Sequence, residues 1–140
     1  MRPIHLATLA AVLALAGGPA VAGSDTGDAE EYVPEAETSE LHQAPLAGVE
    51  GKEVVVKEFT LPPGHEGKAH KHSGPVFVYV IEGELTVETD EGDHTFAAGD
   101  LYPEPLDVTM RARNVSADSP TKIVVFQIND AGEVMMKKAE

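Results

Sequence analysis

From about residue 41 onward the chain alternates short apolar runs with turn-forming residues. The runs are rich in Val, Ile, Phe, Tyr and Thr, and Gly, Pro and Asp separate them, which is the pattern of β-strands bounded by turns. It predicts strands at residues 53–60, 76–81, 84–89, 94–97, 108–113 and 122–128. No stretch reads as a long amphipathic helix. We therefore expect residues 41–130 to form one all-β domain, either a sandwich or a closed barrel.

The two ends of the chain have a different composition. Residues 1–22 combine a positive side chain, a short apolar run and the small-residue pattern Ala20-Val21-Ala22, which predicts a cleaved signal peptide. The apolar run is too short to span a bilayer, so we expect an exported, periplasmic or secreted protein without membrane insertion. Residues 23–40 read as an acidic, disordered leader. Residues 131–140, with two adjacent methionines, read as a frayed tail.

Charge and cysteine content narrow the chemistry. The formal net charge is −14, and such an acidic chain repels nucleic-acid phosphates and anionic lipid surfaces. There is no cysteine, so disulfides and thiolate metal sites are unavailable. Any metal ion must be bound by His, Met, carboxylate or backbone oxygen.

The clearest chemical feature is the pair His70 and His72 just before an apolar run. Side chains alternate along a strand, so two histidines separated by one residue lie on the same face. Two imidazoles on one face can chelate a transition metal ion. The alternative is a structural pair that binds no metal.

These residues belong to a longer pattern that resembles the two sequence motifs of the cupins. The first motif, G-x5-H-x-H-x3,4-E-x6-G, is matched by Gly64, His70, His72 and Gly83. The second, G-x5-P-x-G-x2-H-x3-N, is matched by Gly99, Pro105 and Asn114. The resemblance covers about residues 49–128 and implies a double-stranded β-helix, a jelly-roll barrel whose open end holds a ligand. It also implies pairing of two chains, since exposed strand edges favour a homodimer.

The departures from these motifs fall on expected metal ligands. Val76 stands where the first motif has Glu, Met110 stands where the second has its His, and Asp107 replaces the second motif's internal glycine. Loss of a carboxylate and an imidazole weakens a site for Mn(II) or Fe(II). The altered residue at position 107 also predicts a differently shaped turn before Met110.

Several residues could complete the site. Two imidazoles plus the Met110 thioether would favour copper, especially Cu(I), although a methionine on a barrel strand also fits as core packing. If Glu104 turns inward it could supply the missing carboxylate and suit Fe, Mn, Ni or Zn; on a rim strand we expect it to be solvated. His65 reads as a loop residue close enough to cover a bound ion. His42 and His94 read as surface residues.

The resemblance also predicts the lining of the pocket. With His70 and His72 pointing inward, it places Val76, Val78 and Val80 on the same side and Phe77, Tyr79 and Ile81 on the other. A valine-lined cavity with two imidazoles suits a small, partly apolar ligand.

Three functions fit the sequence. One is a metal-dependent exported enzyme, an oxygenase or isomerase, as the resemblance to germin-like and quercetinase-like proteins implies. A second is a metal- or copper-binding protein without turnover. The third is a module that binds a small ligand or a partner without metal. The His pair ranks a metal-binding cupin first, with catalysis left open.

Overall fold

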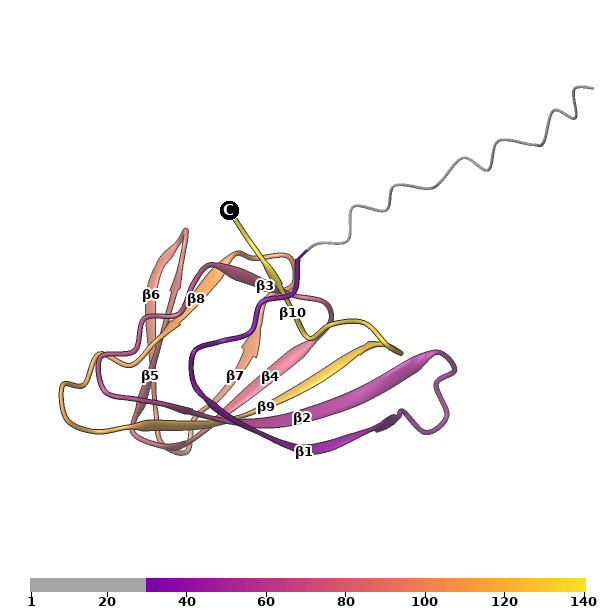
Figure 1. Ribbon diagram of the computed structural model, residues 1–140, viewed down its shortest axis with the longest axis horizontal. Helices are drawn as coiled ribbons and strands as arrows, with labels where there is room; N and C mark the ends of the chain where they lie inside the picture. The colour runs from indigo at the N-terminus through magenta and orange to yellow at the C-terminus, as the bar shows by residue number, and fades with distance from the viewer. Residues whose placement is uncertain (1–29) are drawn as a thin grey trace, which may run out of the picture.

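The computed structural model describes residues 30–140, and every regular element in that range is a β-strand. The strands are β1 Glu37–Pro45, β2 Lys52–Leu61, β3 His70–His72, β4 Val76–Glu82, β5 Glu84–Thr89, β6 Gly92–Ala97, β7 Leu101–Glu104, β8 Met110–Arg113, β9 Thr121–Asp130 and β10 Met136–Lys138. They form two five-stranded sheets, β1-β2-β9-β4-β7 and β10-β3-β8-β5-β6, which lie against each other (Figure 1).

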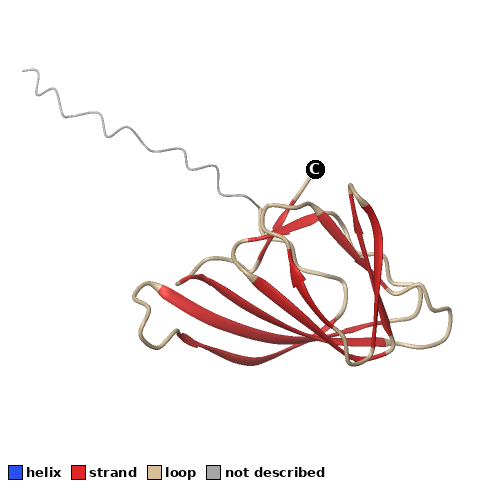
Figure 2. Cartoon of the chain, turned by 180° about the vertical axis from the view of Figure 1, so that it is seen from behind, coloured by secondary structure: helices blue, strands red, loops and turns tan. Residues whose placement is uncertain are grey.

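All strand pairs within the two sheets are antiparallel. Figure 2, seen from behind, shows the two sheets converging at one side of the molecule and separating at the other. Between them lies a core of valines, leucines and isoleucines whose most buried members include Val80, Leu85 and Val87. The prediction of an all-β, double-stranded β-helix barrel is confirmed.

All six predicted strands are present, with boundaries shifted by up to two residues. Four strands were not predicted: β1, β3, β7 and β10. Strand β1 is exposed over most of its length and β3 has the polar sequence His-Lys-His, so neither shows an apolar run. Strand β7 contains a proline, a residue found in strands mainly at sheet edges. These strands form because neighbouring strands pair with them.

Both ends of the described chain belong to the barrel, contrary to the predicted leader and tail. Strand β1 starts at Glu37 and pairs with β2, and Tyr32 before it is buried in the core. At the other end Met135 and Met136 are buried, and β10 pairs with β3. Pairing and apolar burial outweigh the acidic and polar composition of these segments. The predicted signal peptide, residues 1–22, lies outside the described residues.

The turn before β8 keeps a backbone shape that glycine would adopt. Asp107 has φ 60°, in the left-handed region that glycine enters most easily and Asp or Asn more readily than other residues. The prediction of a differently shaped turn is therefore wrong at this residue. Asp107 adopts the left-handed conformation that a glycine there would adopt. The hairpin between β4 and β5 uses Gly83 at φ 75°.

Asn114, the last residue of the second sequence motif, joins three chain segments. Its amide nitrogen donates to the carbonyls of Leu61, Pro62 and Ser119 at 3.1, 3.1 and 2.8 Å. Its oxygen accepts from the backbone N–H of Ser116 at 3.1 Å, and the residue is 2% exposed. Asn114 thus ties the end of β2 to the loop between β8 and β9.

Replacing Asn114 with alanine should destabilise the protein by about 2 kcal/mol, because it leaves carbonyls without their donor in a largely buried place. Chemical denaturation with urea measures this directly. Asp118→Ala, in the same loop but exposed, should change stability by less than about 0.5 kcal/mol. Equal effects of the two substitutions would contradict this role for Asn114.

No helix in residues 30–140 could cross a membrane.

Candidate functional site

His70 and His72 lie on β3 between β10 and β8. Both side chains point into the space between the sheets, and their rings are 5.2 Å apart and nearly perpendicular. Lys71 between them is exposed. The predicted placement of the two imidazoles on one inward face is therefore what the structure has.

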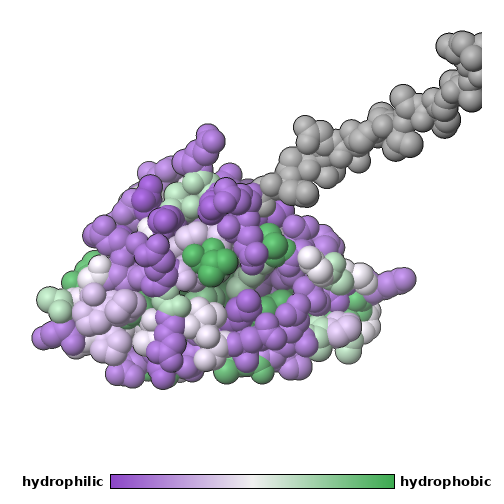
Figure 3. Space-filling view, viewed as in Figure 1, coloured by the Kyte–Doolittle hydropathy of each residue, from purple (hydrophilic) through white to green (hydrophobic). Residues whose placement is uncertain are grey.

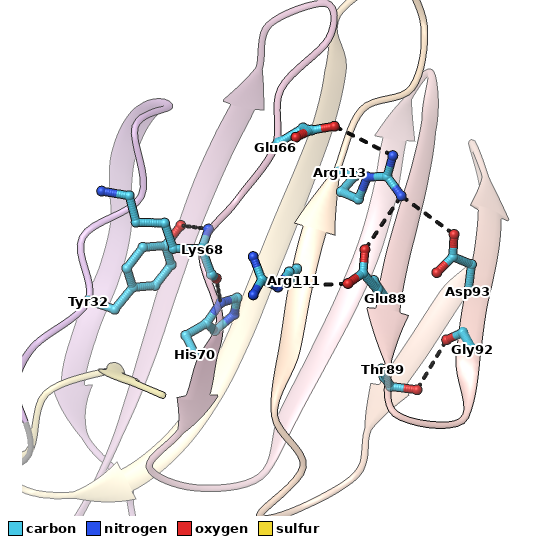
Figure 4. Close-up of polar contacts among 10 residues, drawn as sticks. All are labelled: Tyr32, Glu66, Lys68, His70, Glu88, Thr89, Gly92, Asp93, Arg111 and Arg113. Atoms are coloured by element: carbon cyan, nitrogen blue, oxygen red, sulfur yellow. Dashed lines mark hydrogen bonds and ion pairs between the residues drawn. The ribbon is translucent and has the colours of Figure 1, made fainter. Parts of the chain in front are cut away.

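Hydrogen bonds at Nδ1 fix which nitrogen of each ring faces the interior. His70 Nδ1 lies 3.0 Å from the carbonyl of Lys68, which can only accept, so Nδ1 carries the proton (Figure 4). His72 Nδ1 lies 2.9 Å from Oε1 of Gln127, and the amide nitrogen of Gln127 donates to the Met135 carbonyl at 2.8 Å. In the neutral rings both Nε2 atoms therefore carry a lone pair. Ligating histidines are held in this way around metal ions.

Glu104, expected to be solvated, points inward from β7. Its Oε2 lies 2.9 Å from Nε2 of His72, and both side chains are less than a tenth exposed. The two atoms are close but not aligned as a hydrogen bond, so this buried oxygen has no hydrogen-bond partner. Pairing of β7 with β4 brings Glu104 opposite Val76, the position where the cupin motif has its glutamate. A carboxylate of the neighbouring strand therefore lies beside the position at which the first motif has its own.

The buried carboxylate shifts nearby pKa values. Burial alone lowers the pKa of His72, but contact with Glu104 and Gln127 outweighs it and raises that pKa above its usual value. Burial dominates at His70, whose pKa is lowered. Burial, assisted by Glu104, raises the pKa of Tyr102. In the metal-free protein His72 and Glu104 therefore form an imidazolium–carboxylate pair more readily than exposed groups would.

The stability of the metal-free protein should depend on this pair. Because the folded pKa of His72 is raised, its contribution is complete below the unfolded pKa of about 6.5 and is lost as pH rises through the folded value. We expect the stability advantage of the wild type over Glu104→Gln to shrink as the pH rises above about 6.5 and passes through the raised folded value. Thermal unfolding in the presence of a chelator measures it. An advantage that grows with pH would contradict the raised pKa.

A narrow cavity of about 50 Å³ reaches the His pair and Glu104. Its apolar wall comes mainly from β2 and β9, through Phe59, Leu61, Ile123 and Val125. A wider outer cavity of about 460 Å³ shares Tyr32 and His65 with it. The two cavities therefore lie next to each other at these residues. The inner space holds only a few atoms.

Tyr32 and His65 stand where the two cavities meet. The Tyr32 ring stacks on the His70 ring at 4.8 Å, and its hydroxyl accepts a hydrogen bond from the Lys68 backbone at 3.1 Å (Figure 4). His65, predicted as a loop residue, is in the loop but buried, and burial lowers its pKa. His42 and His94 are exposed, as predicted.

Two predicted site assignments differ from the structure. Val76, Val78 and Val80 face inward as predicted, but they pack in the core and do not line the cavity at the His pair. Met110 lies opposite His70 in the β3–β8 pairing and is 2% exposed in the core, also outside the cavity lining. The thioether that does line the cavity is Met136.

Three residues at the site were not predicted from the sequence: Tyr32, Gln127 and Met136. Gln127 carries a signal in the sequence, because it is the one uncharged polar residue within the apolar run 123–128. Tyr32 and Met136 carry none, since each reaches the site only through tertiary contacts. Met136, for example, meets His72 across the β10–β3 pairing.

The donors fit a transition metal ion in chemical type. They comprise two imidazoles with free Nε2 atoms and a buried carboxylate oxygen without a hydrogen-bond partner, a nitrogen and oxygen set that suits Fe, Mn, Ni or Zn. Within residues 30–140, however, no three or more His, Asp or Glu side chains already form a metal-holding group. In the structure, His72 Nε2 and Glu104 Oε2 contact each other directly.

Comparison with known proteins gives one family match and two curated relatives. Residues 57–126, half of the chain, match the family model described as a cupin domain. A 1-hydroxy-2-naphthoate 1,2-dioxygenase of Nocardioides sp. strain KP7 is 34% identical over 50% of this chain and 18% of its own length. The β-alanine degradation protein BauB of Pseudomonas aeruginosa is 36% identical over 52% of this chain and 80% of its own length. The chain thus spans less than a fifth of the dioxygenase.

Solved structures agree with the fold. A cupin domain from Bordetella pertussis Tohama I superposes with a TM-score of 0.55 and 29% identity, covering 69% of this chain and 95% of that one. A protein with a double-stranded β-helix domain from Klebsiella pneumoniae gives a TM-score of 0.57 at 21% identity, covering 81% of this chain and 92% of that one.

Proposed function

This chain belongs to the cupin family, and on that basis we propose that it is an exported metalloprotein that binds a transition metal ion through His70, His72 and Glu104. The cavity beside them binds a small, partly apolar molecule. Catalysis of the oxygenase type is part of the proposal, supported by the 1-hydroxy-2-naphthoate 1,2-dioxygenase among the relatives. Export rests on the composition of residues 1–22.

The observation that carries the proposal is the approach of His72 Nε2 to Glu104 Oε2. With His72 Nδ1 donating to Gln127, a neutral ring places the Nε2 lone pair beside a carboxylate oxygen only 2.9 Å away. Two lone pairs at that distance repel each other unless a cation or a proton lies beside them. Ligand atoms each about 2.1 Å from an ion and at right angles are about 3 Å apart, close to this separation.

The inward carboxylate changes the preferred metal. Two imidazoles and one carboxylate suit Fe(II), Mn(II), Ni(II) or Zn(II) better than Cu(I). Copper through Met110 ranks second, because Met110 packs in the core outside the cavity lining. Met136 is the thioether that lines the inner cavity.

The protein's own residues have separable tasks at this site. Lys68 and Gln127 fix the two rings through their Nδ1 atoms. Phe59, Leu61 and Ile123 exclude water from the inner cavity. A bound ion would supply a Lewis acid or a redox centre with room for one small ligand. Glu104 would lose its pairing with a protonated His72 when an ion binds.

Glu104→Gln tests the proposal, because it keeps the shape of the side chain and removes its charge. After chelation and reconstitution with Fe(II), Mn(II), Ni(II), Zn(II) or Cu(I) in turn, the wild type should retain about one ion per chain. The variant should bind that ion about 10- to 100-fold more weakly. Glu58→Gln, on the outer face of the barrel, is the control and should bind like the wild type. No uptake of any of the five ions would overturn the proposal.

One alternative is supported by a specific observation. The absence of a ready-made group of three donors in the described residues, with the raised pKa of His72, favours a metal-free module that binds its ligand beside an imidazolium–carboxylate pair. In that case ¹⁵N NMR of the purified protein at neutral pH should show both nitrogens of His72 protonated. The metal proposal instead expects Nε2 without a proton in the reconstituted protein.

A further inference from the structure

Residues 30–36, the segment before β1, pass across the end of the barrel that holds the His pair. Figure 1 shows this segment, in indigo, running from beside β10 to the start of β1. Its alternate residues Tyr32, Pro34 and Ala36 line the inner cavity. Val33 between them is 69% exposed, and Figure 3 shows hydrophobic spheres near the middle of this otherwise mainly hydrophilic side of the molecule. The segment therefore forms one wall of the inner cavity and faces solvent on its other side.

With this segment in place, the inner cavity is too small for the partly apolar molecule proposed above. Sites for small molecules usually have about 300–1,000 Å³, whereas the inner cavity has about 50 Å³. The outer cavity, at about 460 Å³, is within that range, and Tyr32 lines both cavities. The Tyr32 ring also stacks on the His70 ring at 4.8 Å. Tyr32 thus stands between a cavity of sufficient size and the imidazole of His70.

Few backbone contacts hold this segment in place. The N–H of Lys138 donates to the Glu30 carbonyl at 2.7 Å. The N–H of Tyr32 donates to the Met136 carbonyl at 3.0 Å. In the described part of the chain, residues 33–36 make no backbone-to-backbone hydrogen bond. A segment with few backbone hydrogen bonds and few buried side chains opens at a lower cost in free energy than a core strand does.

We propose that residues 30–36 are a lid over the His pair and that Tyr32 is the residue that keeps the lid closed. Tyr32 is held by stacking on His70 and by its hydroxyl, which accepts a hydrogen bond from the N–H of Lys68 at 3.1 Å (Figure 4). Pairing with β2 starts at Glu37, so the lid can turn about this point while the strands of the barrel stay paired. Release of Tyr32 joins the two cavities and gives a molecule of more than a few atoms access to the imidazoles.

Diethyl pyrocarbonate tests access to His70 in protein kept free of metal by a chelator. The reagent modifies neutral imidazole nitrogens, and Nε2 of His70 carries a lone pair. Because the reagent is too large for the inner cavity, it should react with His70 only while the lid is open. Fragmentation mass spectrometry gives the rate at His70 relative to the rate at the exposed His42. No ion takes part, so a failure of the lid would leave the proposed metal site standing.

Tyr32→Phe keeps the ring over His70 and removes the hydroxyl that accepts from the Lys68 N–H. The relative rate at His70 should rise about 2- to 10-fold, as expected when one hydrogen bond that holds the lid closed is lost. Val33→Ala, which truncates the exposed neighbour of Tyr32, is the control and should react like the wild type. An unchanged rate at His70 in Tyr32→Phe would overturn the role of Tyr32.

A disulfide can hold the lid closed, because the chain has no cysteine of its own. Glu31 and Lys137 lie opposite each other in an antiparallel bridge, between the two backbone hydrogen bonds that join the lid to β10. Such a pair has Cα atoms about 4.5 Å apart, a separation that a disulfide spans. Oxidised Glu31→Cys/Lys137→Cys should react at His70 at least about 10-fold more slowly than Glu31→Ser/Lys137→Ser, with equal rates at His42. Equal rates at His70 in these two variants would show that the reagent reaches His70 without opening of the lid, and the lid would be excluded.

Discussion

Removal of both imidazoles, His70→Ala/His72→Ala, should reduce metal uptake to background. The two residues supply both nitrogen donors of the proposed site, and each is already held by a hydrogen bond at Nδ1. Loss of a residue that only orients a ligand costs about 10- to 100-fold in affinity, so loss of two ligands should cost more than 100-fold. Isothermal titration of the metal-free protein with the ion that the wild type retains gives the measurement.

Folding must be controlled in this experiment, because the double variant leaves Glu104 buried beside an empty space. His70→Ala alone preserves the contact between His72 and Glu104, so it should stay folded and still bind more weakly. His42→Ala/His94→Ala removes two exposed imidazoles and should titrate like the wild type. Wild-type affinity in a folded double variant would exclude the His pair as ligands.

The same titration shows which methionine, Met110 or Met136, contributes its thioether to a copper site. If copper is the ion, Met110→Leu or Met136→Leu should weaken binding according to which sulfur takes part. Met136 lines the cavity and Met110 does not. A loss confined to Met110→Leu would restore the copper site expected from the sequence motif.

The fold could be predicted where local pattern and final contacts agree. Residues 76–81 and 122–128 alternate or run apolar because β4 and β9 lie at the centre of their sheet, and both were predicted. Strands β1, β7 and β10 lie at sheet edges, where one neighbour supplies the pairing and no apolar run is needed. Strands β7 and β10 depend on partners farther away in sequence, β4 and β3, whereas β1 pairs with β2, the next strand along the chain.

The site could be predicted only where its geometry follows from local sequence. The spacing of His70 and His72 is a local property, so their common inward face followed from strand geometry. Glu104 was misplaced because its direction depends on the pairing of β7 with β4, which puts it opposite Val76. A sequence motif gives the residue type expected at one position of the chain. It does not show which residue of a neighbouring strand lies beside that position, as Glu104 lies beside Val76.

Gly74→Ala should be the most destabilising single substitution among the glycines of the barrel. A Cβ atom at Gly74 would lie 2.0 Å from the carbonyl oxygen of Ile128 and 3.0 Å from its carbon. Both are backbone atoms of β9, and Ile128 is also fixed by a hydrogen bond from its N–H to the Pro75 carbonyl at 3.0 Å. Relief would require separating the β3–β4 loop from the central strand. We expect a loss of about 4 kcal/mol in the free energy of unfolding, at the upper end for overpacking.

Gly132→Ala is the matched control. Gly132 has a φ of 82° and nothing within 4 Å of an added Cβ, so it should lose only the left-handed strain of about 1 kcal/mol. Gly74 also directly follows the segment that carries His72, whose ring is fixed by Gln127 on β9. Any folded Gly74→Ala protein should therefore bind metal more weakly than Gly132→Ala, because separation of the loop from β9 breaks the contact that orients His72. Equal unfolding free energies for the two variants in urea would show that β9 can move away from an added Cβ at Gly74. The close approach of Gly74 to Ile128 would then not be needed to orient His72.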